Sequence, residues 1–324
     1  MLNYPLRFVP VLRRYLWGGR RLGTELGKPL GPESDYAESW EVVDHGGDQS
    51  VVVAGPHAGR TLHELVIEHN AELFGCHAPQ TQFPLLFKFL DCCRDLSLQV
   101  HPNDEQAQRQ TPPDLGKTEA WIFLAAEPGS IAYAGLKSGI DRCAVEQELA
   151  RGNLPACLNQ VQAQAGDCLF LPAGVVHALG QGFLVAEIQQ ASDTTFRLFD
   201  WNRLDANGQP RELHIEQGLA VTDFYAGPIT PQQPQPADRS HVERLVACDK
   251  FVLDRWRIDQ SQSLANDQRF HIVAVLEGEV TLERDPSQEP LTKGATVLFP
   301  AACQARTIMP RQPSVLLDIY LPDP

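Results

Sequence analysis

Leu96-Ser97-Leu98-Gln99-Val100-His101-Pro102 is the stretch that decides the expected fold, because apolar and polar side chains alternate along it. A period of two is typical of a β-strand. On such a strand the polar side chains project to one face, toward a cavity, and the leucine and valine side chains project to the other. Gln99 and His101 can then reach one metal ion, provided that other elements supply further ligands.

The composition is that of a globular protein, with 43% hydrophobic and 21% charged residues among 324. This length allows two domains with substantial cores. No apolar run approaches the length that spans a membrane, so we expect no membrane partner. The formal net charge of −14 argues against a nucleic-acid partner. An anionic ligand would therefore need a local cluster of lysine and arginine side chains.

The cysteines and the N-terminal residues predict a cytoplasmic protein. The eight cysteines include no C-x-x-C pair and lie mostly beside apolar residues, which favours reduced thiols. Residues 1–14 lack the apolar core of a signal peptide, and Pro5 and Pro10 interrupt them. The sequence leaves open whether the protein is a monomer or a homodimer.

Short β-branched runs between glycine-rich turns predict strands in the first third of the chain, for example at Glu38–Val43. Thr61 followed by Glu64 forms a capping box, which predicts a helix start. The apolar run Phe83–Asp91 predicts a buried strand. Lys88 within this run either extends to the surface or points into a polar cavity to meet an anion.

A second decisive stretch runs from Gly166 to His177, with a turn, an apolar strand, a Pro-x-Gly bend and then a histidine. This order is typical of a barrel strand whose last side chain turns inward. The stretch alone does not distinguish an inward-pointing ligand from a core histidine held only by hydrogen bonds.

The chain repeats part of this stretch, because Gly294–Ala302 matches Gly166–Gly174 at a constant offset of 128 residues (294 − 166). At that offset His177 corresponds to Ala305, so the second unit is expected to lack the metal ligand. We expect a catalytic domain at residues 1–228, a Pro/Gln-rich linker at 229–240 and a degenerate C-terminal domain at 241–324.

Four residues from three predicted strands offer two imidazoles, one carboxylate and one amide oxygen: Gln99, His101, Glu119 and His177. These donors suit Zn²⁺, one ion per chain, and do not exclude Fe(II), Mn(II) or Co(II). If Lys88, Lys117 and Arg197 converge on the site, they supply the positive potential that an anionic substrate needs. Arg197 could instead pair with Asp200.

Six motifs in order make residues 10–225 resemble the type I mannose-6-phosphate isomerases (phosphomannose isomerases), especially the short bacterial form. The motifs are Trp17–Gly19, Ala37–Trp40, Leu96–Pro102, Gly116–Trp121, Pro172–His177 and Glu187–Arg197. The resemblance implies a mainly β fold of two cupin (jelly-roll β-barrel) units, with a few helices inserted in the first.

The resemblance also implies site roles. The zinc ligands would be Gln99, His101, Glu119 and His177. The catalytic residues would be Arg197 and Lys117, and the substrate-binding residues would be Ser97, Lys88 and Glu38. The implied reaction is the interconversion of mannose 6-phosphate and fructose 6-phosphate through a cis-enediol.

Three points stay open at this stage. The base is either Lys117 or a metal-bound hydroxide. Arg203 is a candidate to replace a second lysine that the family carries beyond its arginine. A non-catalytic cupin that binds or senses a sugar phosphate is the alternative function, and Lys117 favours the isomerase, since a binding protein has no need of an acid/base group there.

Overall fold

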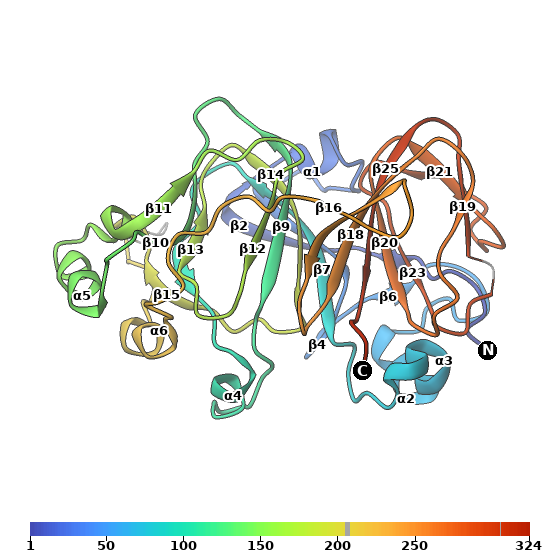
Figure 1. The fold of residues 1–324 in the computed structure, drawn as a ribbon, viewed down its shortest axis with the longest axis horizontal. Helices are drawn as coiled ribbons and strands as arrows, with labels where there is room; N and C mark the ends of the chain where they lie inside the picture. The colour runs from blue at the N-terminus through green and yellow to red at the C-terminus, as the bar shows by residue number, and fades with distance from the viewer. Residues whose placement is uncertain (205–207, 305) are drawn as a thin grey trace.

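The computed structural model describes residues 1–204, 208–304 and 306–324. Ala305, at which the second unit is expected to lack the histidine ligand, lies outside the described residues. The predicted mainly β fold is confirmed: four larger sheets of antiparallel strands form most of the molecule (Figure 1). No helix among the described residues is long and apolar enough to cross a membrane.

Two sheets enclose the interior of the first β unit. The five-stranded sheet has the order β11 (Leu158–Val161), β10 (Ala132–Leu136), β13 (His177–Leu179), β8 (Leu98–Val100) and β15 (Phe196–Phe199). The six-stranded sheet has the order β12 (Cys168–Leu171), β9 (Glu119–Ala126), β14 (Phe183–Gln190), β7 (Leu85–Cys92), β3 (Tyr36–Val42) and β2 (Val11–Gly19).

The second β unit also has a larger and a smaller sheet. The six-stranded sheet has the order β16 (Gln235–Pro236), β17 (Val242–Ala247), β18 (Val252–Ile258), β25 (Ser314–Tyr320), β20 (His271–Glu277) and β23 (Thr296–Phe299). The four-stranded sheet has the order β19 (Gln262–Ser263), β24 (Thr307–Pro310), β21 (Glu279–Leu282) and β22 (Leu291–Thr292). Two short pairs complete the strands: β1 (Phe8–Val9) with β6 (Val51–Val52), and β4 (Asp44–His45) with β5 (Asp48–Gln49).

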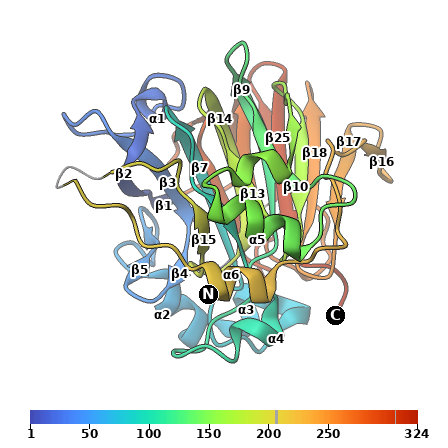
Figure 2. The ribbon, with the colours of Figure 1, turned by 90° about the vertical axis from the view of Figure 1, so that its left-hand side faces the viewer.

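The helices are short and lie outside the sheets. They are α1 (Arg21–Thr24), α2 (Leu62–Glu68), α3 (Asn70–Phe74), α4 (Asp104–Ala107), α5 (Arg142–Ala150) and α6 (Ile215–Val221), with 3₁₀ turns η1 (Gly75–His77) and η2 (Leu154–Cys157). Helix α2 starts at the predicted capping box, because Thr61 and Glu64 satisfy each other's backbone amides. Figure 2 shows α5 in front of β10 and β13, and α6 lower in the view, where it contacts β15 and β8 of the same five-stranded sheet.

The first six-stranded sheet has one apolar face and one partly polar face. On β7, Phe87 and Phe89 pack in the core shared with the second unit, whereas Lys88 and Leu90 face the interior of the first unit. Strand β14 follows the same rule, because Ile188 joins the shared core and its neighbour Glu187 faces the interior. Period-two alternation therefore places polar groups inside a barrel while both faces stay covered.

The repeated stretches have matching structures. Strands β12 and β23 have bounds that differ by the offset found in the sequence, and Gly166 and Gly294 before them have φ angles of 92° and 89°. Such positive φ angles favour glycine.

Leu96 was predicted to project away from the cavity together with Leu98 and Val100, and this prediction was wrong. Leu98 and Val100 pack under the helices, but Leu96 joins a different cluster inside the barrel and lines the cavity. The cause is that β8 begins only at Leu98, so its alternation does not extend to Leu96.

Candidate active site

Three buried side chains come together at strand ends inside the first β unit. His101 follows β8, Glu119 begins β9 and His177 begins β13. Their candidate ligand atoms all lie within 4.8 Å of one another. Three of the four predicted metal ligands are thus gathered at one point, on two facing sheets.

The hydrogen bonds of both imidazoles leave one nitrogen of each ring facing this point. Nδ1 of His101 donates to the Thr194 carbonyl oxygen at 2.9 Å, and Nδ1 of His177 donates to the Val175 carbonyl oxygen at 2.8 Å. Because a carbonyl only accepts, Nδ1 of each ring carries a proton, and in the neutral form of the ring the lone pair is on Nε2. This is the arrangement that metal-binding histidines adopt.

The buried atoms of the cluster also lack partners of the usual kind. Within the described ranges, neither carboxylate oxygen of Glu119 nor Nε2 of His177 makes a hydrogen bond. Instead, Nε2 of His177 and one carboxylate oxygen of Glu119 lie 3.1 Å apart, and Nζ of Lys117 lies 3.1 Å from the other carboxylate oxygen. An imidazole lone pair and a carboxylate that face each other while buried indicate that a cation binds between them. The donor set of two imidazoles and a carboxylate fits a divalent transition metal.

The protonation states suit metal binding. Burial and the Lys117 ammonium lower the pKa of His101 well below its ordinary value. Burial alone would raise the pKa of Glu119, but Lys117 and His177 lower it well below its ordinary value. His101 is therefore neutral and Glu119 ionised, as metal ligands must be.

Gln99 lies beside this cluster. It is the direct cross-strand partner of His177 on β13 and of Arg197 on β15. Directly opposed residues project to the same face of a sheet, so the three side chains share the inner face. Gln99 also lines the cavity, in a position from which it could complete a ligand set.

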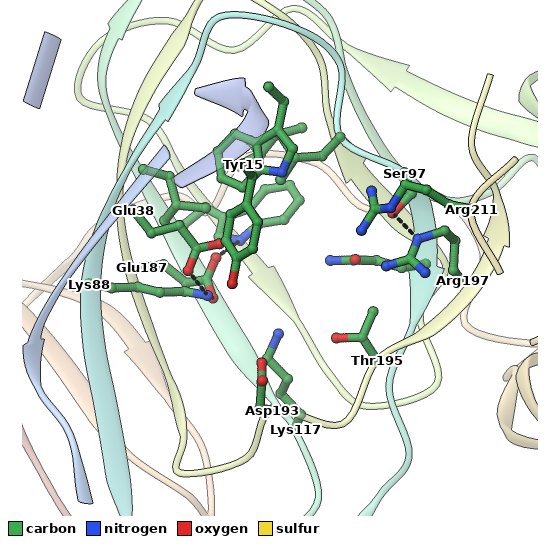
Figure 3. Close-up of a pocket in the computed structure, with 16 residues that line it drawn as sticks. Tyr15, Glu38, Lys88, Ser97, Lys117, Glu187, Asp193, Thr195, Arg197 and Arg211 are labelled. Atoms are coloured by element: carbon green, nitrogen blue, oxygen red, sulfur yellow. Dashed lines mark hydrogen bonds and ion pairs between the residues drawn. The ribbon is translucent and has the colours of Figure 1, made fainter. Parts of the chain in front are cut away.

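The cluster adjoins a cavity of about 290 Å³ between the two sheets (Figure 3). Its lining is mostly polar and includes all the predicted catalytic and substrate-binding residues. The lining residues are Tyr15, Trp17, Glu38, Lys88, Leu90, Leu96, Ser97, Gln99, Lys117, Trp121, Leu179, Glu187, Asp193, Thr195, Arg197 and Arg211.

One side of the cavity carries a lysine held by two carboxylates. Nζ of Lys88 lies 3.1 Å from Glu187 and 3.5 Å from Glu38. Burial would lower the pKa of Lys88, but the carboxylates of Glu187 and Glu38 raise it, so the lysine is charged. Trp121 and Trp40 donate from their indole nitrogens to Glu187 and Glu38, which fixes both carboxylates. Lys88 thus points into the cavity with its charge already compensated.

The other side carries two arginines beside a serine (Figure 3). Nε of Arg197 donates to the Ser97 hydroxyl at 3.2 Å, and its Nη1 donates to the Glu212 carbonyl oxygen at 3.0 Å. Burial lowers the pKa of Arg197, and the neighbouring Arg211 lowers it further. Two neighbouring guanidinium groups at a cavity give this side a positive charge that would attract an anion.

Arg197 does not pair with Asp200, which was its alternative role. Asp200 instead pairs with Arg203 and lies 3.7 Å from Nη1 of Arg211. Arg203 also donates to the Asp95 carbonyl oxygen and lies outside the cavity lining. Arg211, rather than Arg203, is thus the additional cation at this site.

Lys117 joins the cavity to the ligand cluster. Its Nζ lies 3.2 Å from Nε2 of His101 and 3.1 Å from a carboxylate oxygen of Glu119. Lys117 and Glu119 thus meet on one side of the chain, although β9 begins only at Glu119. A molecule bound against this cluster would lie next to the amine.

Sequence reasoning missed several cavity residues. Glu187 begins one of the six motifs but has no predicted role, and its alternation with apolar neighbours along β14 was the available signal. Arg211 and Tyr15 stand in segments without a motif, so no local signal marks them. Asp193 and Thr195 lie within the motif that ends at Arg197 and were not assigned a role.

Comparison with known proteins identifies the family. The chain is 35% identical over 305 residues to the mannose-6-phosphate isomerase ManA of Bacillus subtilis (strain 168), covering 93% of this chain and 94% of that protein. The chain belongs to the mannose-6-phosphate isomerase family. A mannose-6-phosphate isomerase of Streptococcus mutans is 34% identical, covering 91% of this chain and 92% of that protein.

Family profiles and solved structures agree with this membership. The profile "Phosphomannose isomerase type I, catalytic domain" matches residues 6–120, and the profile "Mannose-6-phosphate isomerase, cupin domain" matches residues 241–310. The crystal structure of the Bacillus subtilis mannose 6-phosphate isomerase superposes with a TM-score of 0.88 at 30% identity, covering 98% of this chain and 100% of that one. A phosphomannose isomerase of Salmonella typhimurium shares the fold, with a TM-score of 0.77 at 16% identity, covering 98% of this chain and 99% of that one.

Proposed function

We propose that this member of the mannose-6-phosphate isomerase family interconverts mannose 6-phosphate and fructose 6-phosphate through a cis-enediol. The observation that supports this best is the buried His101–Glu119–His177 cluster, whose ligand atoms lie within 4.8 Å of one another and adjoin a cavity that also contains Lys117 and Arg197. The reaction needs a proton moved between neighbouring carbons while negative charge develops on the sugar oxygens. The cavity offers groups suited to both tasks.

We propose Zn²⁺ as the ion, held by Gln99, His101, Glu119 and His177, with other divalent ions as substitutes. Nitrogen and oxygen donors of this kind suit zinc. When bound, the ion supplies Lewis acidity that polarises the substrate oxygens. The residues of the chain determine where the substrate sits and which group handles the proton.

The two sides of the cavity suggest which end of the substrate each one holds. Ser97 and Arg211 are proposed to bind the phosphate, because the arginine pair is not fully balanced by carboxylates. Lys88 is already neutralised by Glu38 and Glu187, so it adds less attraction for an anion than the sequence suggested. We propose that Glu38 and Lys88 contact the sugar hydroxyls.

The reactive end would lie against the ligand cluster. Lys117 is proposed to move the proton between C2 and C1, because its amine is next to two of the ligand atoms. Arg197 is proposed to stabilise the negative charge of the enediolate. Arg197 on β15 is the cross-strand partner of Gln99 on β8, and Gln99 is in turn the partner of His177 on β13. Truncation of either side chain should lower kcat more than it changes KM.

The proposed location is the cytoplasm. None of the eight cysteines, all within the described ranges, forms a disulfide bond, and five of them are at least partly buried, as expected in a reducing compartment. A monomer or a homodimer stays a prediction from the sequence.

The test is turnover of mannose 6-phosphate by the zinc-loaded protein, with a chelated sample and His177→Ala beside it. Both should lose activity by several orders of magnitude, while His63→Ala, on the exposed side of α2, should keep it. Turnover in D₂O should place deuterium on C1 of the product or C2 of the substrate. If the loaded protein bound mannose 6-phosphate and never converted it, the non-catalytic binding function would replace this proposal.

A further inference from the structure

The loop between β14 and β15 has two different sides. Asp193 and Thr195 line the cavity, as Figure 3 shows. The carbonyl oxygen of Thr194, between them, accepts the proton of His101 Nδ1 at 2.9 Å. The orientation of the His101 ring therefore depends on where this loop holds one backbone oxygen.

The opposite side of the loop is anchored by one carboxylate. Oδ2 of Asp114 accepts hydrogen bonds from the hydroxyl groups of Ser192 and Thr194, both at 2.7 Å. The Ser192 hydroxyl in turn accepts from the Thr194 amide at 3.2 Å. Two hydrogen bonds to one oxygen hold the loop residues on either side of Asp193 together.

Asp114 is itself held in place. Its Oδ1 accepts from the Leu115 amide at 2.8 Å and lies 3.4 Å from Nε2 of His45 on β4. Burial would raise its pKa, but hydrogen bonds from His45, Thr194 and Ser192 lower it well below its ordinary value. The carboxylate is therefore ionised, and hydrogen bonds to an ionised acceptor are stronger than neutral ones.

We propose that Asp114 is a positioning residue that sets the orientation of His101, and the place of Asp193 and Thr195 in the cavity, through the Ser192–Thr195 loop. The inference rests on the metal site proposed above. Partners that hold a metal-binding histidine fix its tautomer and ring direction, and their loss typically costs about 10- to 100-fold in metal affinity or activity. Asp114 acts on the carbonyl one step further out, so the lower end applies.

The test measures the affinity of the full-length protein for Zn²⁺ by competition with a chelating dye. Asp114→Ala should lower the affinity by about 10-fold. Thr194→Val, which removes the hydroxyl but keeps the backbone carbonyl, should lower it by a smaller factor. The matched control is Asp141→Ala, which removes a carboxylate that caps the Ala144 amide of α5, and it should leave the affinity unchanged.

A structural role alone would lower the free energy of unfolding without a selective loss of metal affinity. The inference is overturned if Asp114→Ala binds Zn²⁺ as tightly as the Asp141→Ala control. If Asp114→Ala does not fold, the affinity of Thr194→Val for Zn²⁺ becomes the test. It should be lower than that of the wild type, and an equal affinity would overturn the inference. A wild type that binds Zn²⁺ without turnover would overturn the proposed reaction but not the role of Asp114, whereas a wild type without affinity for Zn²⁺ would overturn the inference with the metal site.

Discussion

The chemistry of single residues in this protein depends on their backbone partners. His101 and His177 both donate Nδ1–H to a carbonyl oxygen, so both present a lone pair on Nε2. Lys88 shows the opposite case, because two carboxylates satisfy its charge before any ligand arrives. Arg197 and Arg211 have fewer carboxylates near them than Lys88 has, since Asp200 lies 3.7 Å from Arg211. Arg211 therefore gives the clearest prediction for a single residue.

Arg211→Ala should raise the KM for mannose 6-phosphate by roughly 10- to 100-fold, because a charged hydrogen bond to the phosphate contributes about 1.5–3 kcal/mol. Its kcat should change little, since this group lies away from the reacting carbons. Steady-state kinetics provides the measurement. Arg94→Ala removes an exposed arginine outside the cavity lining and is the control. Equal KM values for Arg211→Ala and the control would exclude the phosphate role.

At the scale of elements, neighbouring strands bring polar groups together across a sheet. In the second unit, His271 on β20 is buried between Asp318 on β25 and Asp267 in the segment before β20. Nδ1 of His271 lies 2.7 Å from Asp318, and its Nε2 lies 3.2 Å from Asp267. Burial opposes the charged form, but Asp318 and Asp267 outweigh it and raise the pKa of His271 to about 9.

This raised pKa predicts a pH dependence of stability. Since the folded pKa lies above the unfolded value of about 6.5, protonated His271 contributes stability that is fully present below that value. The contribution, on the order of 1–3 kcal/mol, should be lost as the pH rises through about 9. Burial also raises the pKa of Asp318, which offsets part of the effect.

The measurement is the free energy of unfolding in urea between pH 6 and pH 10, for the wild type and His271→Gln. The difference between the two proteins should shrink as the pH rises. A difference that stays constant over this range would show that His271 does not carry the charge.

The whole molecule is held together by contacts that cross the expected domain boundary. One hydrophobic cluster combines Phe87 and Ile122 of the first unit with Ile272 and Leu317 of the second. Leu6, near the N-terminus, forms a bridge with Leu298 of β23. Figure 1 likewise places α2 and α3 below the strands of the second unit. We therefore expect the two units to unfold together.

A glycine at one of these contacts should be sensitive to substitution. Gly75, after α3, has a φ angle of 56°, and a Cβ there would lie 2.1 Å from the carbonyl oxygen of Gln268 in the second unit. Gly75→Ala should therefore destabilise the protein by about 3 kcal/mol or more, through backbone strain and a clash that only a shift between the units relieves. Urea unfolding measures this loss.

Gly59→Ala separates the two causes. Gly59 has a φ angle of 82°, but nothing lies within 4 Å of a Cβ placed there. Only the strain of the left-handed backbone remains, which costs about 1–2 kcal/mol. If both variants lost the same free energy of unfolding, the contact between Gly75 and Gln268 would not add to the effect of backbone strain.

The sequence by itself determined features that depend on local patterns. Alternation along Leu96–Pro102 predicted a strand with one polar face, the apolar run Phe83–Asp91 predicted a buried strand, and the capping box at Thr61 predicted the start of α2. The candidate ligands His101, Glu119 and His177 were found because each stands in a recognisable motif at the end of a strand. Such signals depend on steric and hydrogen-bonding preferences of a few consecutive residues.

Only the tertiary structure decided which of these residues meet and what else joins them. Arg211 reaches the cavity from a segment without a motif, and Asp114 holds a loop nearly 80 residues further along the chain. Leu96 lies in the cavity because its strand begins later than the alternation suggested. Contacts between distant segments depend on how sheets pack and register against each other, and no short stretch of sequence carries that information.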